Sequence, residues 1–574
     1  MLFSIDKNKS LTILQAAMAL FIVLAPTLVG ILGAVAGAYA VSFFSLSLLL
    51  IRLKDTEKIY VSRYHFVMLT LLFYSLVSSV WASNREGHLI YLFIIGAVTA
   101  FFSLAVDYFS ESSKETIGRR MMYMLSAGGV ICALLNIIYW ITCIVPVAGK
   151  ESFSKGMGSA DILAVFLLLC ICTSLLLLKG NSSVRRHMIV LGAVLMLFSF
   201  VMCRSLAAWL FAFSILVIYI IGKKGKKSFV TAGILILCAF TLALIITMRF
   251  SLSGAMFKDA FSYALSHPFG IGGGFESSAA FFKTQAYGEN TLTCLFLKVF
   301  AGSGIMGILV IMAIIAFSIS HFIKLKSWIS LIEMFLTAMM LLLPFNGGFT
   351  ALLLWAGLMA YNEQAAGRCN NRLLQKNYLS KTSYVLLVVC VISVMLIGQT
   401  FIRFSADIKR GKGDYSGAYD LYRAAAAINI TDAKSCHNAA QMLRLGKELD
   451  KKNGDAESLI DNAIKRDKRN LAHLEEKAQI YYACKEYEKS ADVFKMAAKG
   501  AVINGKYNLS AVKALYAAMK NYSKGSSEAK RAYEEIVQIA QATEDLDYRK
   551  EINDIADKAL GYTKGELANA QNGN

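Results

Sequence analysis

Charged side chains at the ends of long apolar stretches are the residues of this chain that could do chemistry. Ionisable groups beside a membrane are costly, so each needs a reason to be there. Arg204 lies between two apolar stretches in Cys203-Arg204-Ser205, where a tight hairpin could have used a neutral residue. It either presents a fixed cation to an anionic group or extends to lipid headgroups. We favour the first interpretation.

Two further charges lie near the start of apolar stretches. Lys298 lies about two turns into the stretch that begins near residue 291, where it either extends outward or pairs inside a cavity. Asp161 opens another stretch, and a carboxylate there is stabilised by the helix dipole and free N–H groups. Capping alone would explain Asp161, although a ligand contact stays open.

The segment 249–290 holds the candidate bases. Glu289 could act as a general base, or it and Asn290 could only cap the following helix. His267 is the second candidate, because histidine is a common general base, although His-Pro also marks a turn. The sequence has no phosphate-binding G-x-x-x-x-G-K-[ST] loop, no H-E-x-x-H metal motif and no G-x-S-x-G nucleophile elbow. We therefore expect neither a metal nor a cofactor.

The composition indicates which elements must position these residues. The chain has 574 residues, of which 56% are hydrophobic and 17% charged, against about 25% charged in soluble proteins. This excludes a single soluble domain and a disordered chain. Uncharged stretches of about 20 residues are typical of membrane-spanning helices. We predict an all-α chain, with about 13 spans in residues 1–401 and an outer loop at 249–290.

The loop charges predict the orientation. Most lysines and arginines of residues 1–401 fall in one set of alternate loops, which marks the cytoplasmic side. The N-terminus is then inside, and an odd number of spans puts residues 402–574 outside. The net charge of +20 is explained by this bias, so a nucleic-acid partner is not expected. We predict a multi-pass protein of the cell membrane.

Residues 402–574 show a repeat. Ala456, Ile460 and Ala463 recur 34 residues later as Ser490, Phe494 and Ala497. This period and the small–large–small spacing resemble tetratricopeptide repeats, in which two packed helices form each unit. We expect a helical repeat domain that binds a protein or glycan partner. A disulfide between Cys436 and Cys484 is open, because their spacing does not demand it.

Four segments of the membrane part resemble the O-antigen ligase and polymerase superfamily of bacterial envelope polysaccharide enzymes. They are Met157–Ala164, Cys203–Ala208, Ser266–Gly272 and Leu295–Gly307. Asp161 stands where the family pattern has asparagine, and Gly302 stands where it has glutamate. The histidine that ligases of this family carry before the last segment is missing, and Glu289 lies about one helical turn from its place.

The resemblance implies glycosyl transfer on the outer membrane face, from a polyprenyl-pyrophosphate-linked glycan to an acceptor glycan or envelope polymer. Fixed cations would neutralise the leaving pyrophosphate in place of a metal. The candidates are Arg204 with Arg249 or Lys258, and Glu289 or His267 would take the proton of the acceptor hydroxyl. Asp161, Asn290 and Lys298 would complete the substrate site.

Two other classes of function stay open. A transporter or flippase also suits a dozen spans, but it needs polar or interrupted helices near the membrane midplane. We expect few of these, because the charges that topology leaves unexplained cluster at the outer edge. An anchor for the outer repeats is the third interpretation, although an anchor needs only one span.

Overall fold

The computed structural model is almost entirely helical and divides into two compact units. It describes residues 34–56, 58–82, 84–111, 114–141, 160–178, 183–203, 205–222, 265–273, 295–342, 348–373, 376–468, 470–501 and 505–563, with short pieces of 14–25 and 225–262. The first unit comprises residues 1–80, 90–273 and 292–397, and the second comprises 81–89, 274–291 and 398–574.

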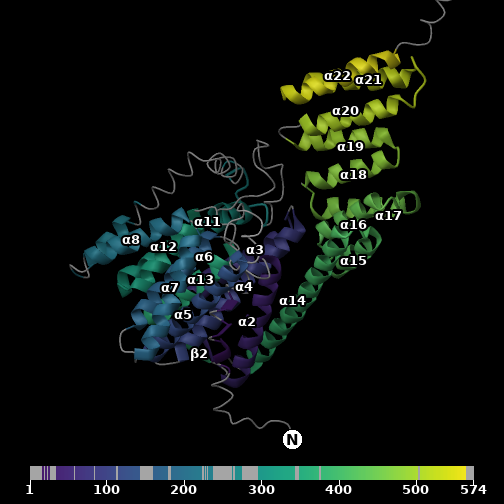
Figure 1. The fold of residues 1–574 in the computed structure, drawn as a ribbon. Coiled ribbons are helices and arrows are strands. Elements are labelled where there is room, and N and C mark those ends of the chain that lie inside the picture. The colour runs from purple at the N-terminus through teal and green to yellow at the C-terminus, as the bar shows by residue number, and fades with distance from the viewer. Residues whose placement is uncertain are drawn as a thin grey trace, which may run out of the picture. The chain divides into compact units, whose positions relative to one another are not determined.

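The first unit is a bundle of apolar helices (Figure 1). Its described helices are α2 (Ala34–Thr56), α3 (Arg63–Ser78), α4 (Arg85–Glu111), α5 (Lys114–Tyr139), α6 (Ala160–Leu177), α7 (Ser183–Met202), α8 (Leu206–Gly222), α11 (Leu295–Leu325), α12 (Trp328–Leu342), α13 (Gly348–Ala365) and the first part of α14 (Lys376–Gly411). α14 continues for ten residues past the expected domain boundary at residue 401.

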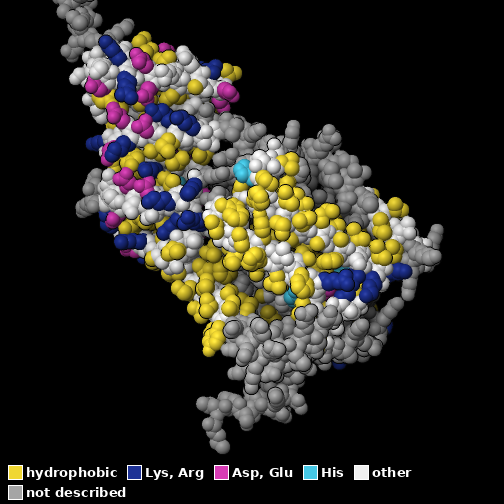
Figure 2. Space-filling model, turned by 180° about the vertical axis from the view of Figure 1, so that it is seen from behind, with side chains coloured by type: hydrophobic (Ala, Val, Ile, Leu, Met, Phe, Trp, Pro, Cys, Tyr) yellow, Lys and Arg dark blue, Asp and Glu magenta, His cyan; other side chains and the backbone are white. Residues whose placement is uncertain are grey.

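Five helices of the described chain are long and apolar enough to cross a membrane. Phe101 and Phe102 of α4, Phe335 of α12 and Trp355 of α13 fill the core. Apolar side chains are also exposed along α7 and α14, and Figure 2 shows hydrophobic side chains over much of the bundle surface. A bundle whose core and surface are both apolar is suited to a lipid environment. Helices are suited to it as well, because they satisfy the hydrogen bonds of their own backbone groups.

One antiparallel pair of strands is present among the described residues. β1 (Lys58–Val61) pairs with β2 (Asn370–Leu373), with Lys58 opposite Leu373 and Val61 opposite Asn370. The pair joins the turn between α2 and α3 to the turn between α13 and α14.

The second unit is a stack of helices that pack one on the next in chain order (Figure 1). They are α15 (Tyr415–Ile428), α16 (Ala433–Leu445), α17 (Leu449–Arg466), α18 (Leu471–Ala483), α19 (Tyr487–Gly500), α20 (Gly505–Met519), α21 (Ser527–Ala542) and α22 (Leu546–Thr563). Asp414, Asp432, Asn470 and Ser526 cap four of these helices through their side chains. Charges of both signs are interspersed over this stack (Figure 2).

The positions of the sequence repeat form the interior of this stack. Ala456, Ile460 and Ala463 of α17 are buried, as are their counterparts Ser490, Phe494 and Ala497 on α19. The small residues allow helices to approach closely, and the larger ones fill the space between them. The structure has no disulfide between Cys436 and Cys484, the pairing that the sequence left open.

Residues 81–89 belong to the second unit and are held there by charges. Arg403 Nη1 lies 3.0 Å from Glu86 Oε1 and 3.5 Å from Asp432 Oδ1. The backbone N–H of Lys434 donates to the second oxygen of Glu86 at 3.1 Å. Asn84 Nδ2 donates to Asp467 at 3.3 Å. A single arginine therefore compensates two carboxylates at the base of the repeats.

Candidate functional site

The structure describes one side chain of the eight candidates, His267. Asp161 and Lys298 lie on α6 and α11, but nothing is described of their side chains. The remaining five candidates lie outside the described residues, as does most of the 249–290 loop with its expected amphipathic stretch. They are Arg204, Arg249, Lys258, Glu289 and Asn290.

The glycine-rich loop, residues 267–273, is bound to α11 through main-chain atoms. Its own turn is closed by a hydrogen bond from Gly270 N to His267 O, at 2.8 Å. Ile305 N donates to Pro268 O at 2.9 Å, and Gly272 N donates to Gly302 O at 3.1 Å. Two of the four segments that carry the family resemblance are therefore in direct contact.

Glycine is required on both sides of this contact. Gly270 has φ +70° and Gly304 has φ +58° with ψ −141°, conformations that L side chains rarely adopt. A Cβ on Gly304 would lie closer than 3.0 Å to Pro268 O, and one on Gly270 would be as close to Gly302 O. The helical hydrogen bonding of α11 is interrupted at Gly304, which opens the helix to the loop.

Two tyrosines support the loop from neighbouring helices. Tyr74 of α3 donates its hydroxyl to Phe269 O at 2.7 Å. The hydroxyl of Tyr91 on α4 lies 3.5 Å from Ser303 Oγ, and its ring packs where a Cβ on Gly273 would be. His267 is half-buried at this junction, with Nδ1 2.9 Å from Ser266 Oγ. An imidazole placed in this way can accept a proton from a bound hydroxyl.

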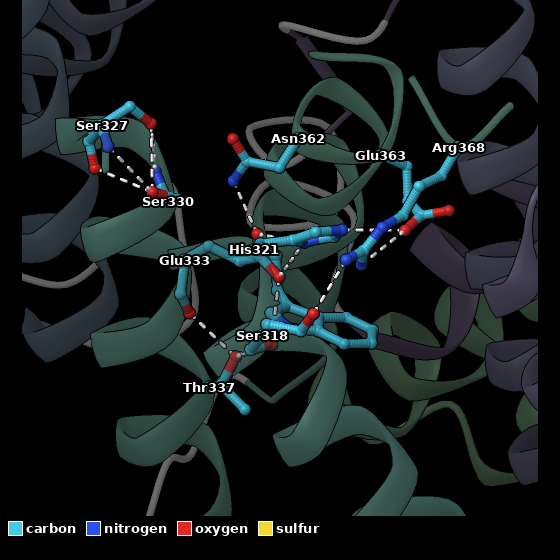
Figure 3. Close-up of polar contacts among 11 residues, drawn as sticks. Ser318, His321, Ser327, Ser330, Glu333, Thr337, Asn362, Glu363 and Arg368 are labelled. Carbon is cyan, nitrogen blue, oxygen red and sulfur yellow. Dashed lines mark hydrogen bonds and ion pairs between the residues drawn. The ribbon is translucent and has the colours of Figure 1, made fainter. Parts of the chain in front are cut away.

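A second polar site lies inside the bundle and was missed by the sequence analysis. His321 of α11 lies between two carboxylates, with Nδ1 3.1 Å from Glu333 Oε2 and Nε2 2.8 Å from Glu363 Oε1 (Figure 3). The three side chains are at most 1% exposed. α11, α12 and α13 each contribute one of them.

The geometry of this triad implies a bound proton. A neutral imidazole donates from one ring nitrogen only, yet both nitrogens of His321 face carboxylate oxygens. Either the imidazole is doubly protonated or one carboxylate is a carboxylic acid. We infer that the triad of His321, Glu333 and Glu363 holds one proton more than a neutral histidine with two carboxylates.

Neutral donors and one arginine surround the triad (Figure 3). Asn362 Nδ2 donates to Glu333 Oε2 at 2.6 Å, and Ser318 Oγ donates to Glu333 Oε1 at 3.0 Å. Arg368 lies on the other side, with Nη1 3.9 Å from Glu363 Oε1 and Nη2 donating to Ser320 Oγ at 2.8 Å. The charges of the triad are therefore compensated within the protein, as burial in a low-dielectric interior requires.

Buried charged groups in the apolar helices are not confined to the triad. A further buried ion pair joins Arg52 Nε to Asp107 Oδ2 at 2.8 Å. The sequence held a signal, because Glu333 interrupts an otherwise uncharged stretch and Ser318 lies three residues from His321 on the same helix face. Arg52 directly follows the uncharged stretch 11–51, where a positive charge by itself indicates only orientation.

Among the described residues, no group of three or more histidine, cysteine, aspartate or glutamate side chains has the arrangement to hold a metal ion. No family model, curated protein or solved structure that was compared with the chain matches it. The functional assignment therefore depends on the residues and on the geometry of the two sites.

Proposed function

We propose that the chain transfers or polymerises polyprenyl-pyrophosphate-linked glycan on the outer face of the cytoplasmic membrane. The contact between the glycine-rich loop and Gly302–Gly304 supports this most, because two segments that resemble the O-antigen ligase and polymerase superfamily meet there through main-chain hydrogen bonds. The same contact places the half-buried imidazole of His267 beside them.

The proposed reaction joins the acceptor hydroxyl oxygen to the anomeric carbon and breaks the bond from that carbon to the pyrophosphate oxygen. The hydroxyl proton passes to a base, for which His267 and Glu289 are the candidates. The lipid pyrophosphate leaves with its negative charge. Arg204, with Arg249 or Lys258, would neutralise that charge, and planar guanidinium groups suit phosphate oxygens.

Lys298, Asn290 and Asp161 would complete the substrate site. Lys298 lies one helical turn before Gly302 on α11, which places its backbone beside the segment that binds the glycine-rich loop. Asp161 lies in the first turn of α6. The proposed role of these residues is to bind the glycan or pyrophosphate.

We further propose about 13 spans, a cytoplasmic N-terminus and an extracytoplasmic repeat domain of tetratricopeptide type. The ion pair between Glu86 and Arg403 supports one part of this, because residues that touch lie on the same side of a membrane. We propose that the turn at residues 81–89 and the repeats lie together on the outer side, as the loop charges predict.

One observation favours a second candidate function, a transporter or flippase without glycosyl transfer. Intramembrane ionisable groups often mark proton or substrate pathways, and the triad of His321, Glu333 and Glu363 is such a group. Transfer of a lipid-linked glycan across liposome membranes, without a new glycosidic bond, would support this candidate over the first.

The test of the first candidate uses cells in which this chain is the only copy. Arg204→Ala and Glu289→Gln should reduce envelope polymer to background, and His267→Gln should lower its amount, with protein levels unchanged. Arg185→Gln is the matched control, because Arg185 is an exposed cation on α7. Unchanged length and amount of polymer in the Arg204 and Glu289 variants would refute the site.

A further inference from the structure

A cavity of about 460 Å³ lies at the end of the bundle where β1 and β2 meet. Ligand pockets in proteins typically measure about 300–1,000 Å³, so this cavity can accept a small ligand or headgroup. Its charged lining residues are Arg63, Lys324 and Arg368, and Ser62 adds a hydroxyl. The other lining residues are apolar or glycine, and none is acidic.

The three cations come from three different parts of the fold. Arg63 begins α3, Lys324 lies in the last turn of α11, and Arg368 follows α13. The positions of two of them are fixed by hydrogen bonds, because Lys324 Nζ donates to Ala366 O and Arg368 Nη2 donates to Ser320 Oγ. Lysine has three donors and arginine five, so donors remain for a ligand.

Arg368 connects this cavity to the buried triad. Its guanidinium is 15% exposed and lies 3.9 Å from Glu363, which itself holds His321. Glu363 compensates part of one positive charge, and neither Arg63 nor Lys324 forms an ion pair with another described residue. Three cations around one cavity, of which Arg368 is partly compensated, match the charge and oxygen-rich shape of a phosphate group.

The cavity is distinct from the glycine-rich loop. The loop contacts α11 at Gly302–Ile305, while the cavity is lined by Lys324. Twenty residues of helix separate Gly304 from Lys324, which is about 30 Å and matches the thickness of a membrane hydrocarbon core. The loop and the cavity therefore lie at opposite ends of the same helix.

We propose that this cavity binds a phosphate group, which belongs either to a membrane lipid headgroup or to a soluble phosphate compound. The site does not depend on the function proposed above, because it shares no residue with the glycine-rich loop. The two sources of phosphate present the same chemistry to Arg63, Lys324 and Arg368, and the test below separates them.

The test uses the full chain in nanodiscs and a double variant, Arg63→Gln with Lys324→Gln. Its control is Arg185→Gln with Arg186→Gln, which removes two exposed cations from α7 and leaves the cavity intact. Arg368 is not changed, because it also compensates Glu363. Both variants should unfold at the same temperature in chloride, which shows that each is folded.

In the first arm, inorganic phosphate is added at constant ionic strength to protein in phosphatidylcholine discs. A soluble phosphate ligand should raise the unfolding temperature of the original chain and of the control. The cavity variant should bind about tenfold more weakly for each cation removed.

In the second arm, discs contain phosphatidylglycerol, and the lipid retained after exchange into detergent is counted by mass spectrometry. Retention that the cavity variant loses and the control keeps would identify a lipid headgroup. If neither phosphate protection nor lipid retention differs between the two variants, the proposal is wrong.

Discussion

The carbonyl oxygen of Pro268 occupies the space where a side chain on Gly304 would begin. Gly304→Ala should therefore destabilise the bundle, because the new Cβ meets that oxygen and the positive φ strains any L residue. Such backbone strain costs of order 1–3 kcal/mol, and the clash adds to it. Thermal unfolding of the purified chain in detergent measures the loss.

Gly398→Ala is the control for this prediction. Gly398 lies within α14 and has open space around its Cβ position. Alanine there should leave stability unchanged or raise it by up to about 1 kcal/mol. Equal unfolding temperatures for the two variants would contradict the proposed contact.

Removal of one carboxylate from the triad should be severe. Glu363→Ala removes the carboxylate that contacts both His321 Nε2 and Arg368 Nη1 inside the bundle. Breaking a buried ion pair in this way costs about 3–5 kcal/mol. Hydrogen exchange in α11, α12 and α13 should accelerate, whereas Asp557→Ala on the exposed face of α22 should change nothing there. Normal protection in the Glu363 variant would show that the triad is not needed for the fold.

Arg403→Ala should release residues 81–89 from the second unit. The substitution leaves Glu86 and Asp432 close to each other without a cation. Because the arginine side chain is 23% exposed, water offsets part of the cost, and we expect about 2–3 kcal/mol. Hydrogen exchange should rise in residues 81–89 and at the start of α16. Arg403→Lys keeps the positive charge. It should therefore lose less than half as much protection from hydrogen exchange as Arg403→Ala loses.

Acidification should loosen α16 and α18. His473 Nδ1 lies 3.1 Å from His437 Nδ1, so at most one of the two atoms carries a proton. Burial lowers the pKa of His437 to about 4 and the pKa of His473 to about 3, compared with about 6.5 in an unfolded chain. As the pH falls below about 6.5, the unfolded state takes up protons first.

The stability of these helices should therefore be constant above pH 6.5 and fall between pH 6.5 and about 3. Hydrogen exchange in α16 and α18, measured across this range, checks the direction. The double variant His437→Gln with His473→Gln cannot take up these protons and should flatten the profile. A profile that is flat in the original chain, or that persists in the double variant, would exclude the histidine pair as its cause.

The sequence predicted the helices well, because their signals are local. Uncharged stretches of membrane length predicted the all-helical fold, and five described helices are long and apolar enough to cross a membrane, whereas the number of about 13 spans stays a prediction. The 34-residue period identified the buried faces of α17 and α19. The contact between the glycine-rich loop and α11 was not predicted. No rule of spacing brings Pro268 next to Ile305.

The triad could not be assembled from the sequence, because its members come from three helices. His321 and Glu363 are 42 residues apart, and their contact depends on how α11 and α13 pack. The cavity could not be predicted from the sequence for a different reason. Arg63, Lys324 and Arg368 all belong to the loops that set orientation, and a count of loop charges treats such residues alike.

Main-chain hydrogen bonds hold the glycine-rich loop on α11, so an exposed side chain of the loop can change during evolution. The hydrogen bonds of the loop to α11 use N–H and carbonyl groups, so the side chain of Phe269 takes no part in them. Phe269 is 73% exposed and can be exchanged for a residue of another size or polarity at little structural cost. A protein built in this way can acquire a new preference at the mouth of the site while its scaffold stays the same.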